Sequence, residues 1–309
     1  MINISGLTFD YPGHRALSNI NLTVTRGSVT AVVGPNGSGK TTLMRCIAGL
    51  EIPLEGSILV DGMDVIERPR EVHRRMGYLS DFFGLYQELT VAQCLEYAAA
   101  SQGLPEIEIQ KAIERTAQQL QISDRLQQKS ASLSRGLRQR VAIAQAIIHN
   151  PKVLLLDEPA SGLDPEARSH LAALFRQLQS SGMTILVSSH ILAELDEYST
   201  HILSLRSGQV MDSRVLLSNQ SDSIRSLQLK LLSADARLES WLREQSGIVN
   251  LNMSPDFVQF EFSGDLKAQA ALLADLLKSG FVVASFAEYK ENLQQTYMRS
   301  VNAHLDITQ

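Results

Sequence analysis

The sequence has few features of secreted, membrane-spanning or nucleic-acid-binding proteins. It contains two cysteines, Cys46 and Cys94, which form neither a metal-binding spacing nor a disulfide framework, as expected in a reducing cytosol. No apolar run approaches the ~18–20 residues that a membrane span requires, and the first residues do not have the pattern of a secretory signal. The net charge is -5, whereas nucleic-acid-binding domains usually carry a basic stripe. We therefore expect a globular, cytoplasmic protein whose composition names no function.

The length and hydrophobic content are sufficient for two globular domains. The 309 residues correspond to two domains at about 150 residues each, and the hydrophobic content of 44% is ordinary. A polar segment at residues 218–223 has the composition of a linker. We therefore expect a first domain over residues 1–217, a linker over 218–226 and a second domain over 227–309.

In the first domain, apolar runs typical of strands alternate with helical patterns. Strands are predicted over residues 2–11, 20–24, 29–33, 153–156 and 184–187. Helical patterns cover most of residues 82–148, where Thr90 is an expected N-cap, and begin again at Asp164. Several of the strands are continuously apolar, as in parallel sheets that are buried on both faces. This alternation predicts an α/β fold with a mainly parallel sheet.

The second domain has a different, α+β pattern. Its elements follow the order strand, helix, strand, strand, helix, strand, which resembles a ferredoxin-like module. Strands are predicted over residues 227–232, 248–253, 257–262 and 281–286, helices over 234–245 and 266–278, and a last helix is marked by Leu293, Tyr297 and Val301.

A glycine-rich segment between a predicted strand and a predicted helix has the pattern G-x-x-x-x-G-K-[ST] of a phosphate-binding loop. It consists of Gly34, Pro35, Asn36, Gly37, Ser38, Gly39, Lys40, Thr41 and Thr42. The glycines let backbone N–H groups converge on phosphate oxygens, and the N-terminus of the helix adds a favourable dipole. We expect the Lys40 ammonium to reach the β- and γ-phosphates of a nucleotide and the Thr41 hydroxyl to ligate Mg²⁺.

An acidic pair ends the predicted strand over residues 153–156. Asp157 lies at the carboxyl end of this strand, beside the phosphate-binding loop, where it can hold the hydration shell of Mg²⁺. Glu158 follows it and could orient and deprotonate an attacking water. Without the phosphate-binding loop, such a pair would more simply be a helix cap.

Further motifs follow in a characteristic order. They are a signature loop over residues 132–140, the acidic pair with Pro159, a D-loop over residues 161–164 and Ser188-Ser189-His190. Together they resemble ABC-transporter ATPases over residues 1–215. The resemblance implies a P-loop NTPase fold with a RecA-like core, an antiparallel β subdomain and a helical subdomain at about residues 82–148. It also implies a dimer in which each ATP lies between the phosphate-binding loop of one subunit and the signature loop of the other.

The resemblance assigns roles to single residues. Tyr11 is similar to the aromatic residue that stacks on adenine, although a tyrosine in a core strand has the same pattern. His190 resembles the switch histidine that contacts the γ-phosphate, and with Lys40 it would stabilise charge there. Asp164 resembles the aspartate that links the two sites of the dimer, and it is also a plausible N-cap of the helix that begins at Pro165.

The signature loop and one Mg²⁺ position depart from the usual family pattern. Ser134 and the N–H of Gly136 would contact the γ-phosphate across the dimer, but Arg135 and Leu137 replace a glycine and a glutamine. Arg135 would add positive charge near the phosphates. Asp81 stands where the family usually has glutamine and could accept a hydrogen bond from a metal-bound water. Both departures are similar to the ATPase subunits of ABC-2-type exporters of the sodium-efflux and multidrug type.

The resemblance therefore implies an ATPase that drives a separate integral-membrane permease from the inner face of the cell membrane. It would act as a homodimer or with a paralogous ATPase, bind two ATP and two Mg²⁺, and have no nucleic-acid partner. An importer ATPase and a non-transport ATPase of the same fold are the alternatives. A permease helix is expected to dock beside residues 81–95, where Phe82-Phe83 could line a groove or belong to the core. The second domain could serve dimer contact, regulation or ligand sensing.

Overall fold

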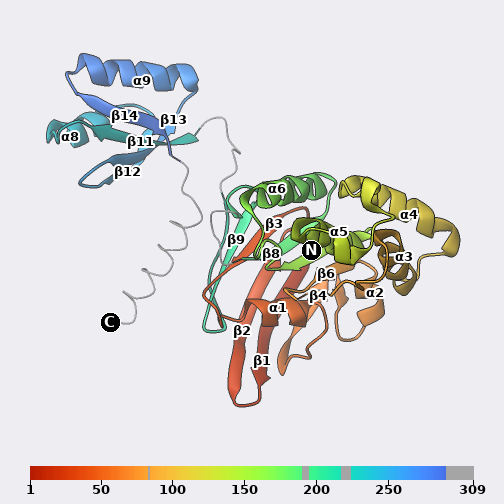
Figure 1. Ribbon diagram of the computed structural model, residues 1–309. Helices are drawn as coiled ribbons and strands as arrows, with labels where there is room; N and C mark the ends of the chain where they lie inside the picture. The colour runs from red at the N-terminus through yellow and green to blue at the C-terminus, as the bar shows by residue number, and fades with distance from the viewer. Residues whose placement is uncertain (83, 190–194, 217–223, 290–309) are drawn as a thin grey trace. The chain divides into compact units, whose positions relative to one another are not determined.

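The computed structural model of the chain describes residues 1–82, 84–189, 195–216 and 224–289. These residues belong to two units, Met1–Leu216 and the described part of Leu217–Asn292 (Figure 1). Each unit has its own hydrophobic core, because no cluster of buried side chains in the described residues contains members of both.

The main sheet of the first unit brings the ends of its parallel strands to one edge. Its strands are β3 (Val29–Val33), β6 (Met76–Leu79), β7 (Val153–Asp157), β8 (Thr184–Ser188), β9 (His201–Arg206) and β10 (Gln209–Val215). The order is β10-β9-β3-β8-β7-β6, with β10 antiparallel to β9 and the other pairs parallel. The segments that follow β3, β6, β7 and β8 therefore meet at the same edge of the sheet.

Successive residues of the central strands face two different cores. In β7, Leu154 and Leu156 pack into one core, while Val153 and Leu155 pack into the other. All four side chains are buried because both faces of the sheet are covered. This confirms the prediction of buried parallel strands from their continuous apolar runs.

Helices cover one face of the main sheet and contribute to the first of these cores. They are α3 (Val91–Ser101), α4 (Glu106–Gln119), α5 (Arg135–Ile147) and α6 (Pro165–Ser180), with 3₁₀ turns at Ser123–Arg125 and Ser130–Ser132. Thr90 caps α3 as predicted, because its hydroxyl accepts from the Gln93 N–H and its own N–H donates to the Gln93 side chain. Asp164 caps α6 in the same way, through the Ala167 N–H at 2.8 Å.

The opposite face is covered by α1 (Lys40–Ile47) and by an antiparallel sheet. This sheet has the order β2-β1-β4-β5, formed by β1 (Ile2–Tyr11), β2 (His14–Val24), β4 (Glu55–Val60) and β5 (Met63–Asp64), and a short helix α2 (Pro69–His73) follows it. The predicted start of the second strand at residue 20 is wrong. Because Pro12 and Gly13 form a tight turn, Tyr11 pairs with His14 and the strand begins there.

The second unit has the predicted strand and helix order. Its elements are β11 (Ile224–Leu231), α8 (Arg237–Glu244), β12 (Ile248–Met253), β13 (Val258–Ser263), α9 (Leu266–Lys278) and β14 (Val283–Glu288). The antiparallel sheet has the order β12-β13-β11-β14, which is the topology of a ferredoxin-like module. Leucines of α8 and α9 pack into one core with β11 and β13. The predicted last helix lies outside the described residues.

Candidate active site

The loop between β3 and α1 is shaped for a close approach of an anion. A side chain at Gly34 would place its Cβ 2.3 Å from the Leu205 carbonyl oxygen and 2.6 Å from the Ser38 Oγ, so only glycine fits. Gly39 adopts a φ of 105° immediately before α1. Among the described residues no side chain caps the N-terminus of α1. Its first N–H groups therefore stay available, in the position where helix N-termini bind phosphate.

The Lys40 side chain folds back over this loop. Its Nζ donates to the carbonyl of Gly34 at 2.9 Å and to that of Pro35 at 3.3 Å, and the residue is buried. A phosphate oxygen would be a stronger acceptor for this ammonium than the two carbonyl oxygens are. Thr41 and Thr42, which we predicted to contact the nucleotide and Mg²⁺, follow Lys40 in the first turn of α1. Thr41 is exposed and Thr42 is buried.

The acidic pair lies at the end of β7, next to the loop. Asp157 is buried, and its Oδ1 accepts from the Ser188 hydroxyl at 2.6 Å. The same hydroxyl accepts from the Glu158 N–H at 2.9 Å. Glu158 has a φ of 49°, which is uncommon for a residue with a side chain. Ser188 thus holds both acidic residues, because β7 and β8 pair Asp157 with Ser188.

Two buried oxygens at this edge have no partner among the residues that the structure describes. They are the Asp157 Oδ2 and the Ser38 Oγ. Buried polar atoms in native proteins are nearly always satisfied, and a ligand bound at this edge would supply partners for these two. Carboxylate and hydroxyl oxygens are hard donors of the kind that Mg²⁺ prefers. No group of three His, Cys, Asp or Glu side chains in the described ranges could hold a metal alone.

Tyr78 lies between the acidic residues of neighbouring strands. Burial, together with the negative charges of Asp157 and Asp81, raises the pKa of Tyr78 to about 12. The pairing of β6 with β7 aligns Leu79 with Leu156, so the segments that contain Asp81 and Asp157 leave the sheet side by side. Asp81 is exposed. A role of Asp81 in binding Mg²⁺ remains a prediction.

The signature loop and the D-loop lie close together in one chain. Ser134 caps α5 by accepting from the Leu137 N–H at 3.3 Å. Arg135, which we expected near the phosphates, donates from Nη2 to the Ser161 carbonyl of the D-loop at 2.8 Å. Gly136 faces Ala167 of α6, whose Cβ lies 3.3 Å from where a Cβ of residue 136 would stand. Ser134 and Arg135 are exposed.

Of the remaining predicted residues, the structure describes Tyr11 and Phe82 but not His190 and Phe83. Tyr11 is 37% exposed, so it is not a core tyrosine, and its ring meets Phe9 edge to face. His190 lies outside the described residues, and so does Phe83. Phe82 is 93% exposed and therefore does not belong to the core.

Local sequence patterns predict no role for Ser188 or Tyr78. The role of Ser188 follows from the register of two strands whose residues are 31 positions apart. A hydroxyl at the carboxyl end of a strand, beside a strand that ends in aspartate, was the available signal.

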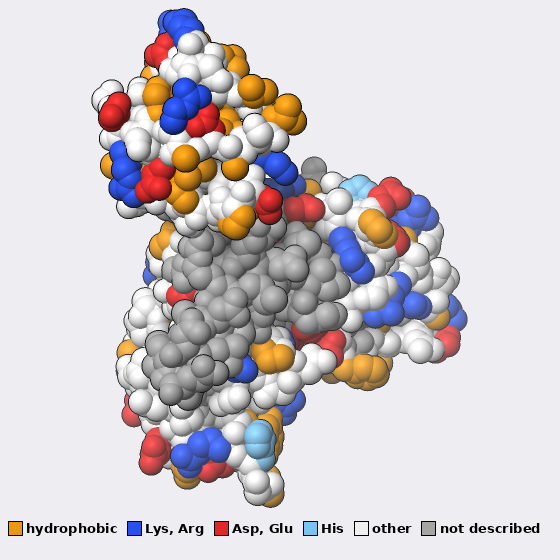
Figure 2. Space-filling model, turned by 90° about the vertical axis from the view of Figure 1, so that its left-hand side faces the viewer, with side chains coloured by type: hydrophobic (Ala, Val, Ile, Leu, Met, Phe, Trp, Pro, Cys, Tyr) orange, Lys and Arg blue, Asp and Glu red, His pale blue; other side chains and the backbone are white. Residues whose placement is uncertain are grey.

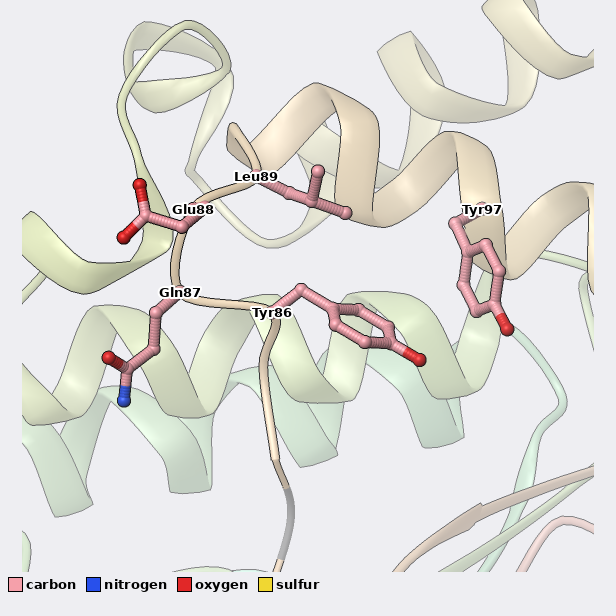
Figure 3. A pocket seen from close by; sticks show the side chains of 5 residues that line it. All are labelled: Tyr86, Gln87, Glu88, Leu89 and Tyr97. Atoms are coloured by element: carbon pink, nitrogen blue, oxygen red, sulfur yellow. The ribbon is translucent and has the colours of Figure 1, made fainter.

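A hollow of about 500 Å³ lies at the start of the helical subdomain, away from the phosphate-binding loop in sequence. It is lined by Tyr86, Gln87, Glu88, Leu89 and Tyr97. Figure 3 shows the Tyr86 ring pointing toward Tyr97, while the Gln87 and Glu88 side chains point the other way. The two rings meet at 5.5 Å, and a hydrogen bond with Tyr97 raises the pKa of Tyr86. None of the described helices has the length and apolar content of a membrane span.

Known proteins are similar to this chain in sequence and in fold. A family model described as ABC transporter matches residues 17–161. The chain is 30% identical to the ABC transporter ATP-binding protein YxlF of Bacillus subtilis, over 98% of this chain and 100% of that protein. It is 36% identical to the ABC transporter ATP-binding protein NatA of Bacillus subtilis, over 71% of this chain and 89% of that protein.

Two further matches carry more specific descriptions. The spermidine/putrescine import ATP-binding protein PotA of Vibrio cholerae is 34% identical over 68% of this chain and 56% of that protein. A dimeric structure of the ATP-binding cassette MJ0796, in a post-hydrolysis state bound to ADP and Pi, has a TM-score of 0.64 at 26% identity. It covers 71% of this chain and 100% of that one.

Proposed function

Because this chain belongs to the family of ABC transporter ATP-binding proteins, we propose that it is the motor subunit of an ABC-2-type export system. As a member of this family the chain is an ATPase that binds ATP with Mg²⁺. The observation that carries the catalytic part is the hydrogen-bonded group of Asp157, Ser188 and Glu158 beside the phosphate-binding loop. We assign the ATPase to residues 1–217 and an accessory role to residues 227–309.

The residues of this site can divide the work of hydrolysis among them. Backbone N–H groups of residues 34–41 and the Lys40 ammonium hold the phosphates and stabilise negative charge that develops on the γ-phosphoryl group. The Glu158 carboxylate accepts a proton from the attacking water, whose oxygen forms the new bond to phosphorus as the bond to the ADP oxygen breaks. Asp157 and Thr41, with Asp81 nearby, would hold Mg²⁺, which neutralises phosphate charge when bound. His190 would contact the γ-phosphate.

A second ATPase subunit would complete each site. Ser134 and the Gly136 N–H stand at the N-terminus of α5, in an exposed position where they can reach a phosphate of the other subunit. Tyr11 is exposed enough to stack on adenine, and Asp164 would link the two sites. The dimeric MJ0796 structure supports this arrangement. The partner is a second copy of this chain or a paralogous ATPase.

A membrane-spanning permease is the other partner in this proposal. The hollow lined by Tyr86, Leu89 and Tyr97 offers aromatic and aliphatic surface that fits the apolar side of a cytosolic helix (Figure 3). Four of its lining residues fall within residues 81–95, and Tyr97 follows shortly after them. The exposed Phe82 precedes them by a few residues in the sequence. The subunit would therefore be cytoplasmic and peripheral on the inner face of the membrane.

Lys and Arg are interspersed with Asp and Glu on the face of the second unit in Figure 2, which favours a protein over a nucleic-acid partner.

Import is the second candidate, and the similarity to PotA is the observation that favours it. Export is favoured by Asp81 and by the Ser134-Arg135-Gly136 form of the signature loop. These residues support a direction of transport only through their resemblance to exporters, so the direction needs a separate test. A DNA-repair or translation ATPase is a weaker alternative, which co-purification with ribosomes or DNA would revive.

Purification of the tagged chain from membranes tests the proposal. We expect a permease to co-purify and the complex to hydrolyse ATP without an extracytoplasmic solute-binding protein. Tyr86→Asp should abolish co-purification, because it places a charge in the docking hollow. A complex whose ATPase activity depends on a solute-binding protein would establish import instead. Recovery of the chain with ribosomes or DNA and without a permease would contradict both transport functions.

A further inference from the structure

The Arg135 side chain lies against the D-loop of its own chain. Its Nη2 donates to the Ser161 carbonyl oxygen at 2.8 Å, across 26 positions of sequence. A hydrogen bond from a guanidinium is stronger than one between neutral groups. Arg135 is exposed. The charge that we expected to face a nucleotide is thus engaged by a backbone carbonyl.

Gly162 is shaped to receive the guanidinium. A Cβ at this position would stand 2.4 Å from the Arg135 Cζ and 2.4–2.5 Å from both terminal nitrogens. The planar group therefore lies over the place that a side chain would fill. Gly162 also has a φ of 68°, which favours glycine, and a Cβ added there would displace the Arg135 guanidinium. Ser161 therefore accepts a hydrogen bond from Arg135, and Gly162 leaves room for its guanidinium.

Buried side chains and helix caps flank this contact. Leu133, Ala160 and Leu163 are buried in the same hydrophobic core, on either side of the contact. Ser134 caps α5 and Asp164 caps α6. The hydrogen bond from Arg135 to the Ser161 carbonyl joins the signature loop to the D-loop between these buried and capped positions.

We propose that Arg135 is a positioning residue that latches the signature loop to the D-loop of the same subunit. The proposal rests on the proposed function as a dimeric ATPase. In such a dimer, Glu158 acts on the ATP of its own subunit, and Ser134 contacts the ATP of the other. The D-loop begins three residues after Glu158. The latch therefore connects the residues that serve one ATP with those that serve the other.

The competing role for Arg135 is that of a nucleotide ligand acting by its charge. The two roles differ in what lysine can do. A lysine keeps the positive charge but lacks the planar group that fits over Gly162 and points a fixed donor at Ser161. A charge-based role is therefore rescued by lysine, whereas a latch is not.

The test uses the full chain with Arg135→Ala, Arg135→Lys, Gly162→Ala and the double variant Arg135→Ala/Gly162→Ala. The matched control is Gly182→Ala, because Gly182 also has a left-handed φ but has nothing within 4 Å of the added Cβ. Steady-state ATPase assays give kcat and KM, and equilibrium binding of a fluorescent ATP analogue gives nucleotide affinity. Hydrogen exchange of residues 158–164 without nucleotide reports on the latch itself.

We expect each single variant, including Arg135→Lys, to lower kcat about tenfold relative to Gly182→Ala while nucleotide affinity is unchanged. The double variant should be no worse than Gly162→Ala, because that variant already loses the contact and carries the same backbone strain at residue 162. Exchange of the D-loop amides should become about tenfold faster. Wild-type behaviour of Arg135→Lys, or defects that multiply in the double variant, would overturn the latch. Unchanged exchange in Arg135→Ala would overturn it even if the chain proved not to be a dimeric ATPase, so the two failures are distinguishable.

Discussion

At the scale of single residues, Ser188 is the side chain on which the catalytic geometry most depends. Its hydroxyl donates to Asp157 and accepts from the Glu158 N–H. We predict that Ser188→Ala lowers kcat about tenfold, because both acidic residues lose a buried hydrogen bond that fixes their position. Steady-state ATPase measurement, with nucleotide affinity determined separately, checks this prediction.

Ser204→Ala is a matched control for this substitution. Ser204 is equally buried, on β9 of the same sheet, but its hydroxyl has no partner among the described residues. We expect its kcat to stay near the wild-type value. Equal losses in the two variants would show that the effect of Ser188 is one of packing.

Single-residue roles could be predicted from the sequence only where a local motif defines them. Lys40 and Asp157 stand in motifs that carry their chemistry, and the structure places them at one edge of the sheet. Ser188 and Arg135 act through contacts 31 and 26 positions away along the chain. No local pattern reports such contacts, because they arise from strand register and from the packing of two loops.

At the scale of elements, one carboxylate ties several strands of the first unit together. Asp61, in the turn between β4 and β5, accepts from Arg26, from Arg75 at 2.7 Å and from Lys152 at 2.9 Å. These cations precede β3, β6 and β7 respectively. Hydrogen bonds from Lys152, Arg26 and Arg75 hold the pKa of Asp61 well below its ordinary value.

We predict that Asp61→Asn lowers the free energy of unfolding by about 1–2 kcal/mol at pH 7, a moderate loss because the cations are half exposed. Since the folded pKa is depressed, the stabilisation is present above the unfolded pKa of about 4 and is lost as pH falls toward the folded pKa. Urea unfolding at pH 7 and pH 3 checks both points. Asp10→Asn, which removes an exposed pair with Arg15, should cost less. A difference from wild type that grows toward pH 3 would contradict this account.

Strands with continuous apolar runs were predictable, and those with short or mixed patterns were missed. Residues 29–33 and 153–157 are buried throughout, and their apolar runs predicted the strands. The first half of β2 was missed because its residues do not alternate: two exposed residues are followed by two buried ones. The hairpin of β9 and β10 had a usable signal in Ser207-Gly208, both of which have positive φ as a two-residue turn requires.

At the scale of the whole molecule, each unit has its own core. We predict that a chain ending at Ser218 folds and binds ATP with wild-type affinity, because the phosphate-binding loop and both cores beneath it lie within residues 1–216. Equilibrium binding and thermal unfolding measure this. Its dimerisation and ATPase rates then show whether the second unit serves dimer contact or regulation. A truncated chain that fails to bind ATP would contradict the independence of the first unit.

The central claim is that Glu158 is the base of an ATPase, and the ATPase rate of Glu158→Gln tests it most directly. The isosteric amide cannot accept the proton, so we predict that turnover falls about a hundredfold or more, while ATP binding and the ATP-bound dimer persist. Lys40→Ala provides the contrasting control, because it should lose nucleotide affinity. Near-normal hydrolysis by Glu158→Gln would contradict the account.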